Sequence, residues 1–477
     1  MLTGADTYDF SEMGDGEDFT TFNPARPAEP VGRYKATTPS RVAAIVTKAQ
    51  AAFTAWSKQP FIERTRRFED GLRQVEDDIE RIAAAITREQ GKPLAEARGE
   101  VRKAVSEARM MAGHVLHAAG SVMPSSARSG LNIVTRRPRG VIAAITPWNF
   151  PVLTPMRKIA PAVLFGNGIV LKPSELAPAS TCMLVEALRT KLPPGLISLT
   201  LGGPPVGEAL VGASGVTGVT FTGSVDTGRK VYGIAAAQLA EVSLEMGGKN
   251  AALVNDAEDL DGCLDAIVAA AFACSGQRCT AISRVIVSRA ISDEVAAGLA
   301  VRSRKQVVGD GFDPSTTMGP LTGPRQFQRV SGMVSRAIRA GAESLLDVES
   351  ADPPPTGGGF FFRPTILTKV HPTAEIAQEE IFGPVIPILE YDTIDQAVEI
   401  ANSVRYGLTT AVFSNRHDVV HRLVAEISSG MIHVNHGTIP DDFMPFGGVG
   451  ESGVGAYSVG ASAASFYTTE HAVYLGR

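Results

Sequence analysis

The segment Gly140-Val141-Ile142-Ala143-Ala144-Ile145 is a short apolar run, and a segment of helical pattern separates it from a second run, Gly168-Ile169-Val170-Leu171. Continuous apolar runs of this length are typical of strands that are buried on both faces. The same alternation continues through Leu196–Leu199, a helical stretch and Val216–Phe221. We therefore expect an α/β fold, with a parallel sheet that helices cover on both sides.

Two helices are predicted upstream of this unit. The first begins at Pro39-Ser40, and its apolar residues recur at helical spacing as far as Trp56. The second is expected to be one helix that carries apolar residues from Phe68 to Ile86 on one face. It should end at Gly91-Lys92-Pro93, because glycine suits the left-handed residue after a helix and proline cannot continue one.

The length and composition predict more than one domain. With 477 residues, of which 44% are hydrophobic and 20% charged, the chain can bury more than one core, and two or three domains are expected. A second alternating series from Ala251 to about Val434 predicts a second α/β domain. The stretch Pro353–Gly359 is interpreted as a brief surface loop and not as a linker.

The charge and the N-terminus argue against two classes of partner. A net charge of −5 gives no general attraction to nucleic acid or to an anionic membrane. Met1–Asp18 lacks the basic flank and apolar run of a signal peptide, and no stretch approaches the roughly 18 apolar residues of a membrane span. A cytoplasmic protein without nucleic-acid or membrane partners is predicted.

The four cysteines point to one candidate nucleophile. Cys182, Cys263, Cys274 and Cys279 are too few and too irregularly spaced for a disulfide framework or a zinc site, and no metal is predicted. Cys274 follows an apolar, helix-like segment and is interpreted as a core residue. A free cysteine is usually a small buried hydrophobe, but a thiol such as that of Cys279 can also attack a carbonyl carbon and hold the product as a thioester.

Two further segments supply groups that suit such chemistry. Glu245-Met246-Gly247-Gly248-Lys249 provides a carboxylate, and Thr146-Pro147-Trp148-Asn149-Phe150-Pro151 provides an amide donor. Taken alone, Glu245 is equally typical of a solvated strand end and Asn149 of a turn. Together with Ser275-Gly276-Gln277-Arg278-Cys279-Thr280, the segments form a candidate catalytic set of Cys279, Glu245 and Asn149.

A cofactor site is expected at the carboxyl ends of the first strands, where open α/β sheets bind ligands. Lys172 and Glu175 follow the second strand, and a carboxylate there can accept hydrogen bonds from an adenosine ribose. Gly223 and Ser224 follow the third strand at a probable helix start, where backbone amides can meet a pyrophosphate. The first strand leads into Thr146-Pro147-Trp148, so the common GxGxxG fingerprint is absent.

These motifs, in this order, resemble those of the aldehyde dehydrogenase superfamily, and most closely its semialdehyde dehydrogenase branch. The resemblance covers nearly the whole chain and ends at Pro445-Phe446-Gly447-Gly448. It implies a Rossmann-like NAD(P)-binding domain (residues 1–120 and 140–247), an α/β catalytic domain (248–445), and an oligomerisation flap with a C-terminal arm (121–139 and 446–477). A homodimer or homotetramer is implied.

The resemblance also implies roles for single residues. Cys279 attacks the aldehyde, the Asn149 amide and the Cys279 backbone N–H stabilise the oxyanion, and Glu245 activates water to hydrolyse the thioester. NAD is favoured, because Glu175 would meet the phosphate of NADP with like charge, although Lys172 leaves NADP open. The implied cofactor residues are Thr146, Pro147, Trp148, Lys172, Ser174, Glu175, Gly203, Gly207, Phe221, Gly223, Ser224, Met246, Gly247, Glu380 and Phe382.

The substrate is predicted to be a short polar or anionic aldehyde. Arg157 stands at a family position that faces the aldehyde tunnel and could pair with an anionic tail, although the second arginine of succinate-semialdehyde enzymes is replaced by Ala273. The implied substrate residues are Arg157, Phe150, His436, Thr438 and Phe446, with Pro440 beside them.

Three alternatives stay open at this point. One is an aromatic or simple aliphatic aldehyde, with Arg157 turned to solvent. Another is acyl transfer to coenzyme A, which the presence of Glu245 disfavours. The last is a catalytically silent relative, which the presence of all three catalytic residues disfavours.

Overall fold

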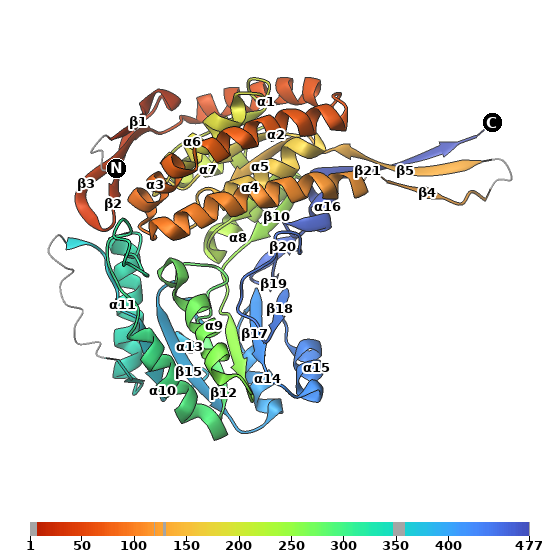
Figure 1. Cartoon of the computed structure of the whole chain (residues 1–477). Helices are drawn as coiled ribbons and strands as arrows, with labels where there is room; N and C mark the ends of the chain where they lie inside the picture. Colours follow the sequence, from red (N-terminus) through yellow and green to blue (C-terminus); the bar gives the residue numbers. More distant parts are fainter. Residues whose placement is uncertain (1–6, 119, 127–129, 347–357, 477) are drawn as a thin grey trace.

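The computed structural model describes residues 7–118, 120–126, 130–346 and 358–476. It has two α/β lobes and a thin arm that projects from the first of them (Figure 1). The first lobe holds the N-terminal half of the chain and the second lobe most of the remainder. Of the predicted loop Pro353–Gly359, residues 353–357 lie outside the described residues.

The first lobe is built on a six-stranded sheet in the order β20-β10-β9-β6-β7-β8. Five neighbouring strands run parallel and only β20 is antiparallel, which confirms the expected parallel sheet. The strands are β6 (Val141–Ile145), β7 (Gly168–Lys172), β8 (Ile197–Leu199), β9 (Val216–Thr222), β10 (Glu241–Glu245) and β20 (Gly453–Gly455).

The register of this sheet aligns the ends of its strands. Ile145 pairs with both Lys172 and Phe221, and Thr222 pairs with Glu245. The segments that follow β6, β7, β9 and β10 therefore leave the sheet at the same edge, where α/β folds bind ligands.

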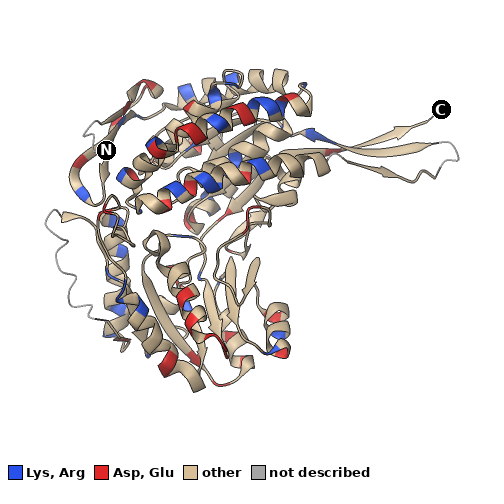
Figure 2. Cartoon of the chain, viewed as in Figure 1, with Lys and Arg blue, Asp and Glu red and all other residues tan. Residues whose placement is uncertain are grey.

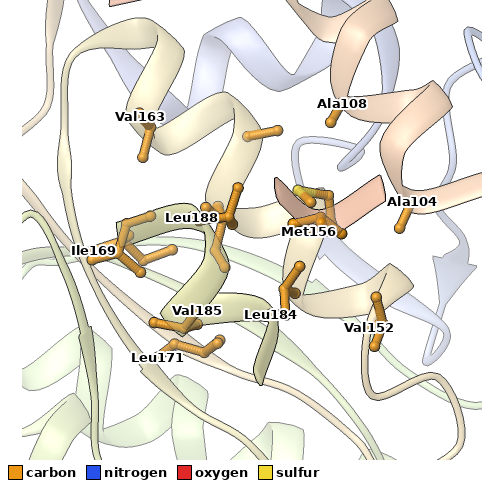
Figure 3. Close-up of a cluster of buried hydrophobic side chains, with 14 of the residues drawn as sticks. Ala104, Ala108, Val152, Met156, Val163, Ile169, Leu171, Leu184, Val185 and Leu188 are labelled. Atoms are coloured by element: carbon orange, nitrogen blue, oxygen red, sulfur yellow. The ribbon is translucent and has the colours of Figure 1, made fainter. Parts of the chain in front are cut away.

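Helices cover both faces of this sheet, and several of them form its largest core. In the close-up of Figure 3, Val185 and Leu188 of α6 lie beside Ile169 and Leu171 of β7, and Ala104 and Ala108 of α4 lie on the side of Met156 of α5. The helices of this lobe are α1 (Pro39–Trp56), α2 (Phe61–Asp77), α3 (Ile79–Gln90), α4 (Leu94–His117), α5 (Leu153–Phe165), α6 (Ala179–Arg189), α7 (Pro204–Val211), α8 (Val225–Ala237) and α16 (Ala463–Tyr467).

The prediction of one helix from Phe68 to Ile86 is wrong, because the chain forms α2 and α3 with Asp78 between them. Asp78 has φ −94° and ψ 7°, which interrupts the helical backbone. The apolar pattern continues across the break because both helices bury their faces in the same core. The predicted end is confirmed, since α3 stops at Gln90 and Gly91 takes a left-handed φ of 98°.

The second lobe has a seven-stranded sheet in the order β13-β14-β15-β12-β11-β17-β18. Its strands are parallel except β13, and they span the predicted second series. The strands are β11 (Ala251–Val254), β12 (Arg284–Ser288), β13 (Glu343–Ser344), β14 (Thr365–Thr368), β15 (Val385–Tyr391), β17 (Thr409–Phe413) and β18 (Met431–Val434). The helices are α9 (Leu260–Phe272), α10 (Ser292–Ser303), α11 (Pro324–Arg339), α13 (Glu375–Gln378), α14 (Ile394–Asn402) and α15 (His417–Glu426).

The arm is a three-stranded antiparallel sheet of β4 (Gly120–Met123), β5 (Leu131–Pro138) and β21 (Thr468–Leu475). Its outer part carries few charged residues (Figure 2), and Val122, Met123 and Tyr474 are exposed there. A small N-terminal sheet of β1 (Tyr8–Phe10), β2 (Asp18–Asn23) and β3 (Arg26–Lys35), and a two-stranded sheet of β16 (Tyr406–Gly407) and β19 (Val449–Gly450), complete the fold. Within the described ranges, no helix is long and apolar enough to cross a membrane.

Candidate active site

A cavity of about 1240 Å³ is lined by residues of both lobes and brings most of the predicted site residues together. Its wall includes segments that follow β6, β9 and β10 in the first lobe and residues around Cys279 and Glu380 in the second. The predicted residues that line it are Pro147, Trp148, Asn149, Phe150, Arg157, Glu175, Gly223, Ser224, Glu245, Met246, Gly247, Cys279, Glu380, Phe382 and Phe446.

Cys279 is presented by a constrained loop that follows α9. Cys274 and Ser275 both have left-handed backbones, with φ 53° and 56°, which is unfavourable for residues other than glycine. Hydrogen bonds hold this loop: the Cys274 N–H donates to Glu96 Oε2 (2.9 Å) and Ser275 Oγ to the Gly319 carbonyl (2.7 Å). Cys274 is buried, as expected for a core residue, and all four cysteines are free thiols.

The thiol of Cys279 is strongly biased toward its protonated form. Burial raises its pKa to about 12, and the nearby carboxylate of Glu245 adds to the shift, while the cations Arg157 and Arg278 oppose it. A thiolate is the attacking species of a cysteine nucleophile. Attack by Cys279 at neutral pH therefore requires that its proton be removed as the reaction begins.

Asn149 is buried, and its amide faces the loop of the nucleophile. Asn149 Nδ2 donates to the carbonyl of Gln277 (2.8 Å), two residues before Cys279. An amide nitrogen carries two hydrogens, so one of them stays available to a group in the cavity. The Asn149 side chain is thus both fixed to the nucleophile loop and able to donate to a ligand.

Glu245 ends β10 and projects into the same cavity. Its side chain is 5% exposed, and Thr222 Oγ1 donates to Oε2 at 3.4 Å. Oε1 makes no hydrogen bond to any described residue. A buried carboxylate oxygen without a partner is unfavourable unless a ligand or water supplies one, so this oxygen suits a water-binding base.

The adenosine end of the predicted cofactor site lies beside β7 and the start of α8. Lys172 Nζ lies 3.5 Å from Glu175 Oε2, and Glu175 lines the cavity. Ser224 caps α8 by accepting from the Thr227 N–H (3.4 Å), so the positive helix end faces the cavity wall. Gly207 of α7 lies against Lys172, where a Cβ would be 3.4 Å from Lys172 Cδ.

The other residues predicted for the adenosine end of the cofactor site lie behind the cavity wall and contact the residues around it. The Thr146 N–H donates to the Lys172 carbonyl (3.1 Å), and the Phe221 ring lies so close to Gly223 that a Cβ there would be 2.5 Å from it. Gly203 precedes α7 as its N-cap, and Ser174 Oγ accepts from the Leu176 N–H (3.3 Å). Lys172 itself is buried and is not part of the cavity wall.

Glu380 and Phe382 meet the segment that follows Glu245. Glu380 Oε1 accepts from the Gly248 N–H (3.2 Å), and a Cβ on Gly247 would lie 2.1 Å from Oε2, so any larger residue there would displace the Glu380 carboxylate. Burial raises the pKa of Glu380 to about 7. The Phe382 ring stands edge-on to Trp148 at 5.4 Å. The Met246–Gly248 segment and the Trp148 loop therefore converge on this pair.

Arg157 lines the cavity, but an acidic partner already holds it. Arg157 Nε and Nη2 donate to the two carboxylate oxygens of Glu107, both at 2.6 Å, and its guanidinium lies 4.5 Å from the Phe446 ring centroid. Burial disfavours the charge, but the ion pair with Glu107 outweighs it and holds the pKa of Arg157 above its ordinary value. Nη1 makes no hydrogen bond to a described residue and is free to donate.

Two predicted substrate residues do not reach the cavity wall. His436 is exposed and stacks on His433, with ring centroids 5.5 Å apart. Thr438 is fully buried, and its Oγ1 donates to the Thr280 carbonyl (2.6 Å), so it supports the nucleophile loop. From this loop the predicted Pro440 does line the cavity, together with Ile439, which was not predicted.

Several residues of the site were not predicted. Lys103 lines the cavity from α4, and Gln326 and Arg329 line it from α11. Ser452 supports the Glu245 segment, since its Oγ donates to the Gly247 carbonyl (2.7 Å) and its carbonyl accepts from the Met246 N–H (2.8 Å). The only sequence signal for Gln326 and Arg329 was their spacing of three on one face after Gly323-Pro324.

Comparisons with known proteins agree with this geometry. The family model described as "Aldehyde dehydrogenase family" matches residues 11–473. The chain is 36% identical to the alpha-ketoglutaric semialdehyde dehydrogenase of Bacillus subtilis, over 95% of this chain and 93% of that protein. It is also 36% identical to the mitochondrial succinate-semialdehyde dehydrogenase of Arabidopsis thaliana, over 86% and 77%. Among solved structures, an NAD-dependent aldehyde dehydrogenase from Sinorhizobium meliloti superimposes with a TM-score of 0.95 at 30% identity, covering 99% of this chain and 96% of that one.

Proposed function

Because the chain belongs to the aldehyde dehydrogenase family, and is therefore an NAD(P)-dependent oxidoreductase that acts on aldehydes, we propose that Cys279, Asn149 and Glu245 carry out its reaction. The observation that carries this proposal is that all three line one cavity together with Glu380 and Phe382. The resemblance found in the sequence is thus confirmed at the level of the family, and the roles of single residues are our proposal.

In the first half of the reaction, the Cys279 thiol releases its proton to water in the cavity, and its sulfur bonds to the aldehyde carbon. The carbonyl oxygen becomes an oxyanion, and the free N–H of Asn149 Nδ2 and the Cys279 backbone N–H donate to it. The loss of one such donor typically costs about 2.7–4 kcal/mol of transition-state stabilisation. A bound nicotinamide would supply the hydride acceptor for this carbon, and the loss of hydride would leave an acyl thioester on Cys279.

In the second half, Glu245 removes a proton from water, and the water oxygen attacks the thioester carbon. The C–S bond breaks, the acid leaves, and the Cys279 sulfur takes the proton that Glu245 removed from the water. Oε1 of Glu245, which has no protein partner in the described part of the chain, is the oxygen suited to this step. A well-placed general base contributes about 10²–10⁴ in rate.

The residues of the cofactor side fit a nicotinamide dinucleotide. Small residues at the start of α8 leave room for phosphates, since Gly223 and Ser224 line the cavity at a helix N-terminus. Gly247 allows Glu380 to approach the backbone closely. Glu175 and Lys172 would hold the adenosine ribose, and Glu380 with Phe382 would lie at the nicotinamide end.

We favour NAD over NADP as the preferred cofactor. Glu175 lines the cavity, and its carboxylate would accept bonds from two ribose hydroxyls and repel a phosphate. Burial lowers the pKa of Lys172, and Glu175 partly offsets this shift. A single paired cation therefore offers limited compensation for the phosphate of NADP.

The substrate is proposed to be a short semialdehyde or a similarly polar aldehyde. Two relatives are named for semialdehydes of dicarboxylic acids, and Arg157 keeps Nη1 free at the cavity wall. The alternative substrate is a neutral apolar aldehyde, which would contact Phe150 and Phe446, since both also line the cavity.

The arm is proposed to mediate assembly into a homodimer or homotetramer. Its β-sheet has open edges and exposed apolar residues, including Val122 (69% exposed) and Tyr474 (78%), and such an edge pairs readily with another strand. The domain limits implied by the sequence, and a cytoplasmic location, are kept as proposals. Light scattering that gives a monomer for the intact chain would contradict the assembly.

The direct test of the function is NADH formation from succinic semialdehyde and alpha-ketoglutaric semialdehyde without coenzyme A. We expect turnover on both, together with lower kcat/KM on neutral aldehydes of the same length. Absence of turnover on a broad aldehyde panel would contradict the proposal, and turnover that requires coenzyme A would contradict the hydrolytic step.

A further inference from the structure

The corner between α3 and α4 contacts both loops that carry the proposed reacting groups. We propose that Lys92 and Glu100 are positioning residues, which hold the Asn149 loop so that its amide is aimed at the oxyanion formed on Cys279. This inference rests on the proposed role of Asn149. Neither residue lies in the three catalytic segments, and neither was singled out as functional from the sequence.

Lys92 is a buried ammonium whose donors are all engaged. It is 1% exposed, and its Nζ donates to Glu100 Oε2 and to the backbone carbonyl of Asn149, both at 2.7 Å. The same Nζ lies 4.0 Å from the centroid of the Phe150 ring. Two hydrogen bonds and one cation–π contact use the three N–H groups of a lysine. Lys92 therefore fixes the backbone of the residue that carries the oxyanion donor.

Glu100 holds the other end of the same short loop. Its Oε1 accepts from the backbone N–H groups of Val152 (2.8 Å) and Leu153 (3.0 Å), at the start of α5. A carboxylate at this position also interacts favourably with the helix dipole. The ion pair thus holds residues 149–153 at both ends, which leaves the loop little freedom to move.

The same corner also contacts the nucleophile loop. Gln90 Nε2 donates to Cys274 Sγ (3.3 Å), and Gln90 Oε1 accepts from the Lys92 N–H (2.9 Å). Glu96 Oε2 accepts from the Cys274 N–H (2.9 Å). One element of the first lobe therefore sets the position of the Asn149 loop and of the loop before Cys279 together.

A purely stabilising role accounts less well for the ion pair. A buried ion pair contributes little net stability compared with apolar residues of the same volume. Here its two members make four hydrogen bonds, one of them to each other, and the other three go to backbone groups between Asn149 and Leu153. Reacting groups that are misplaced by about 1 Å can lose about 10²-fold in rate, so this geometry has direct consequences for the reaction.

The test is a double-mutant cycle on the full-length protein with Lys92→Met and Asn149→Ala. We expect Lys92→Met to lower kcat/KM for succinic semialdehyde by about 100-fold. In the Asn149→Ala background, Lys92→Met should lower kcat/KM by less than about 3-fold, because the effects of two residues that act through one another are not additive. Multiplicative effects would overturn the inference and leave the proposed function standing, whereas no effect of Asn149→Ala alone would overturn both.

A second readout separates positioning from general disruption. Alkylation of Cys279 by iodoacetamide forms no oxyanion, so the alkylation rate should change by less than about 3-fold in Lys92→Met. A loss of alkylation rate that parallels the loss of turnover would overturn the inference. Arg64→Met is the matched control, because Arg64 Nε donates to the Leu164 carbonyl (3.0 Å) at the far end of α5. Arg64→Met should destabilise the fold and leave kcat/KM unchanged.

If Lys92→Met does not fold, Glu100→Gln takes its place. This variant should show the same pattern with a loss of kcat/KM of about 10-fold, and an unchanged kcat/KM would overturn the inference.

Discussion

The side-chain amide of Asn149 donates to the backbone carbonyl of Gln277 at 2.8 Å, which ties the proposed oxyanion donor to the loop of Cys279. This bond joins the two lobes across the cavity. It uses one of the two amide hydrogens and orients the other.

Replacement of Asn149 by alanine should therefore slow the chemical step while the fold is kept. We expect kcat to fall by about 10²–10³-fold, the usual cost of one oxyanion donor, with little change in the KM for the aldehyde. Stopped-flow measurement of the first turnover would show the effect in the NADH burst rate. An unchanged burst rate would mean that Asn149 does not stabilise the oxyanion and serves only as a structural residue of the turn.

Arg157 should discriminate between aldehydes by the charge of their tails. In Arg157→Gln, we expect kcat/KM to fall about 10–100-fold more for succinic semialdehyde than for butanal, because a hydrogen bond to a charged group is worth about 1.5–3 kcal/mol. The variant leaves the buried carboxylate of Glu107 with Lys103, 3.5 Å away, in place of its two bonds to Arg157, so Arg157→Gln/Glu107→Gln serves as its control. Equal losses on both aldehydes would refute recognition of an anionic tail.

The reactivity of Cys279 should rise with pH over the whole neutral range. Burial and Glu245 raise the pKa of the thiol to about 12, so below that pKa the thiolate fraction, and with it the rate of alkylation by iodoacetamide, should increase about tenfold per pH unit. The measurement uses the enzyme without cofactor between pH 7 and 9, with Cys279→Ser as the blank. A plateau in this range would show that the thiol is already ionised.

Glu175 should set the cofactor preference. Glu175→Gln removes the negative charge of a residue that lines the cavity, so we expect kcat/KM for NAD to fall about 10-fold and the ratio of NADP to NAD activity to rise. Glu208→Gln, at an exposed glutamate of α7, is the control and should change neither value. A ratio that stays constant in Glu175→Gln would remove Glu175 from the ribose site.

Much of this site could be predicted because it follows from the topology of the sheet. The apolar runs of β6, β7 and β9 specify parallel strands, and the register then brings Asn149, Glu175 and Ser224 to one edge. The partners of these residues could not be predicted. Glu107 and Lys92 come from helices whose periodicity says only which face is buried, and no local pattern indicates that Glu107 neutralises Arg157 or that Lys92 holds the Asn149 carbonyl.

The side-chain directions in the loop around His436 could not be predicted from the sequence either. Its sequence indicates a polar segment near the substrate, but the direction of each side chain depends on how the loop leaves β18. Thr438 is drawn inward by its bond to the Thr280 carbonyl, and His436 points to solvent. The polar residues His436 and Thr438 therefore do not form the cavity wall. The residues of this loop that line the cavity are Ile439 and Pro440, which are apolar.

In the proposed reaction, Cys279 carries the acyl group and Glu245 releases it. The most direct test mixes the Glu245→Gln variant with succinic semialdehyde and NAD, follows NADH, and analyses the quenched protein by mass spectrometry. We expect a burst of about one NADH per active site, a steady-state rate lowered by about 10²–10⁴-fold, and an acyl adduct on the peptide that contains Cys279. Undiminished turnover, or a burst with no adduct on Cys279, would contradict it.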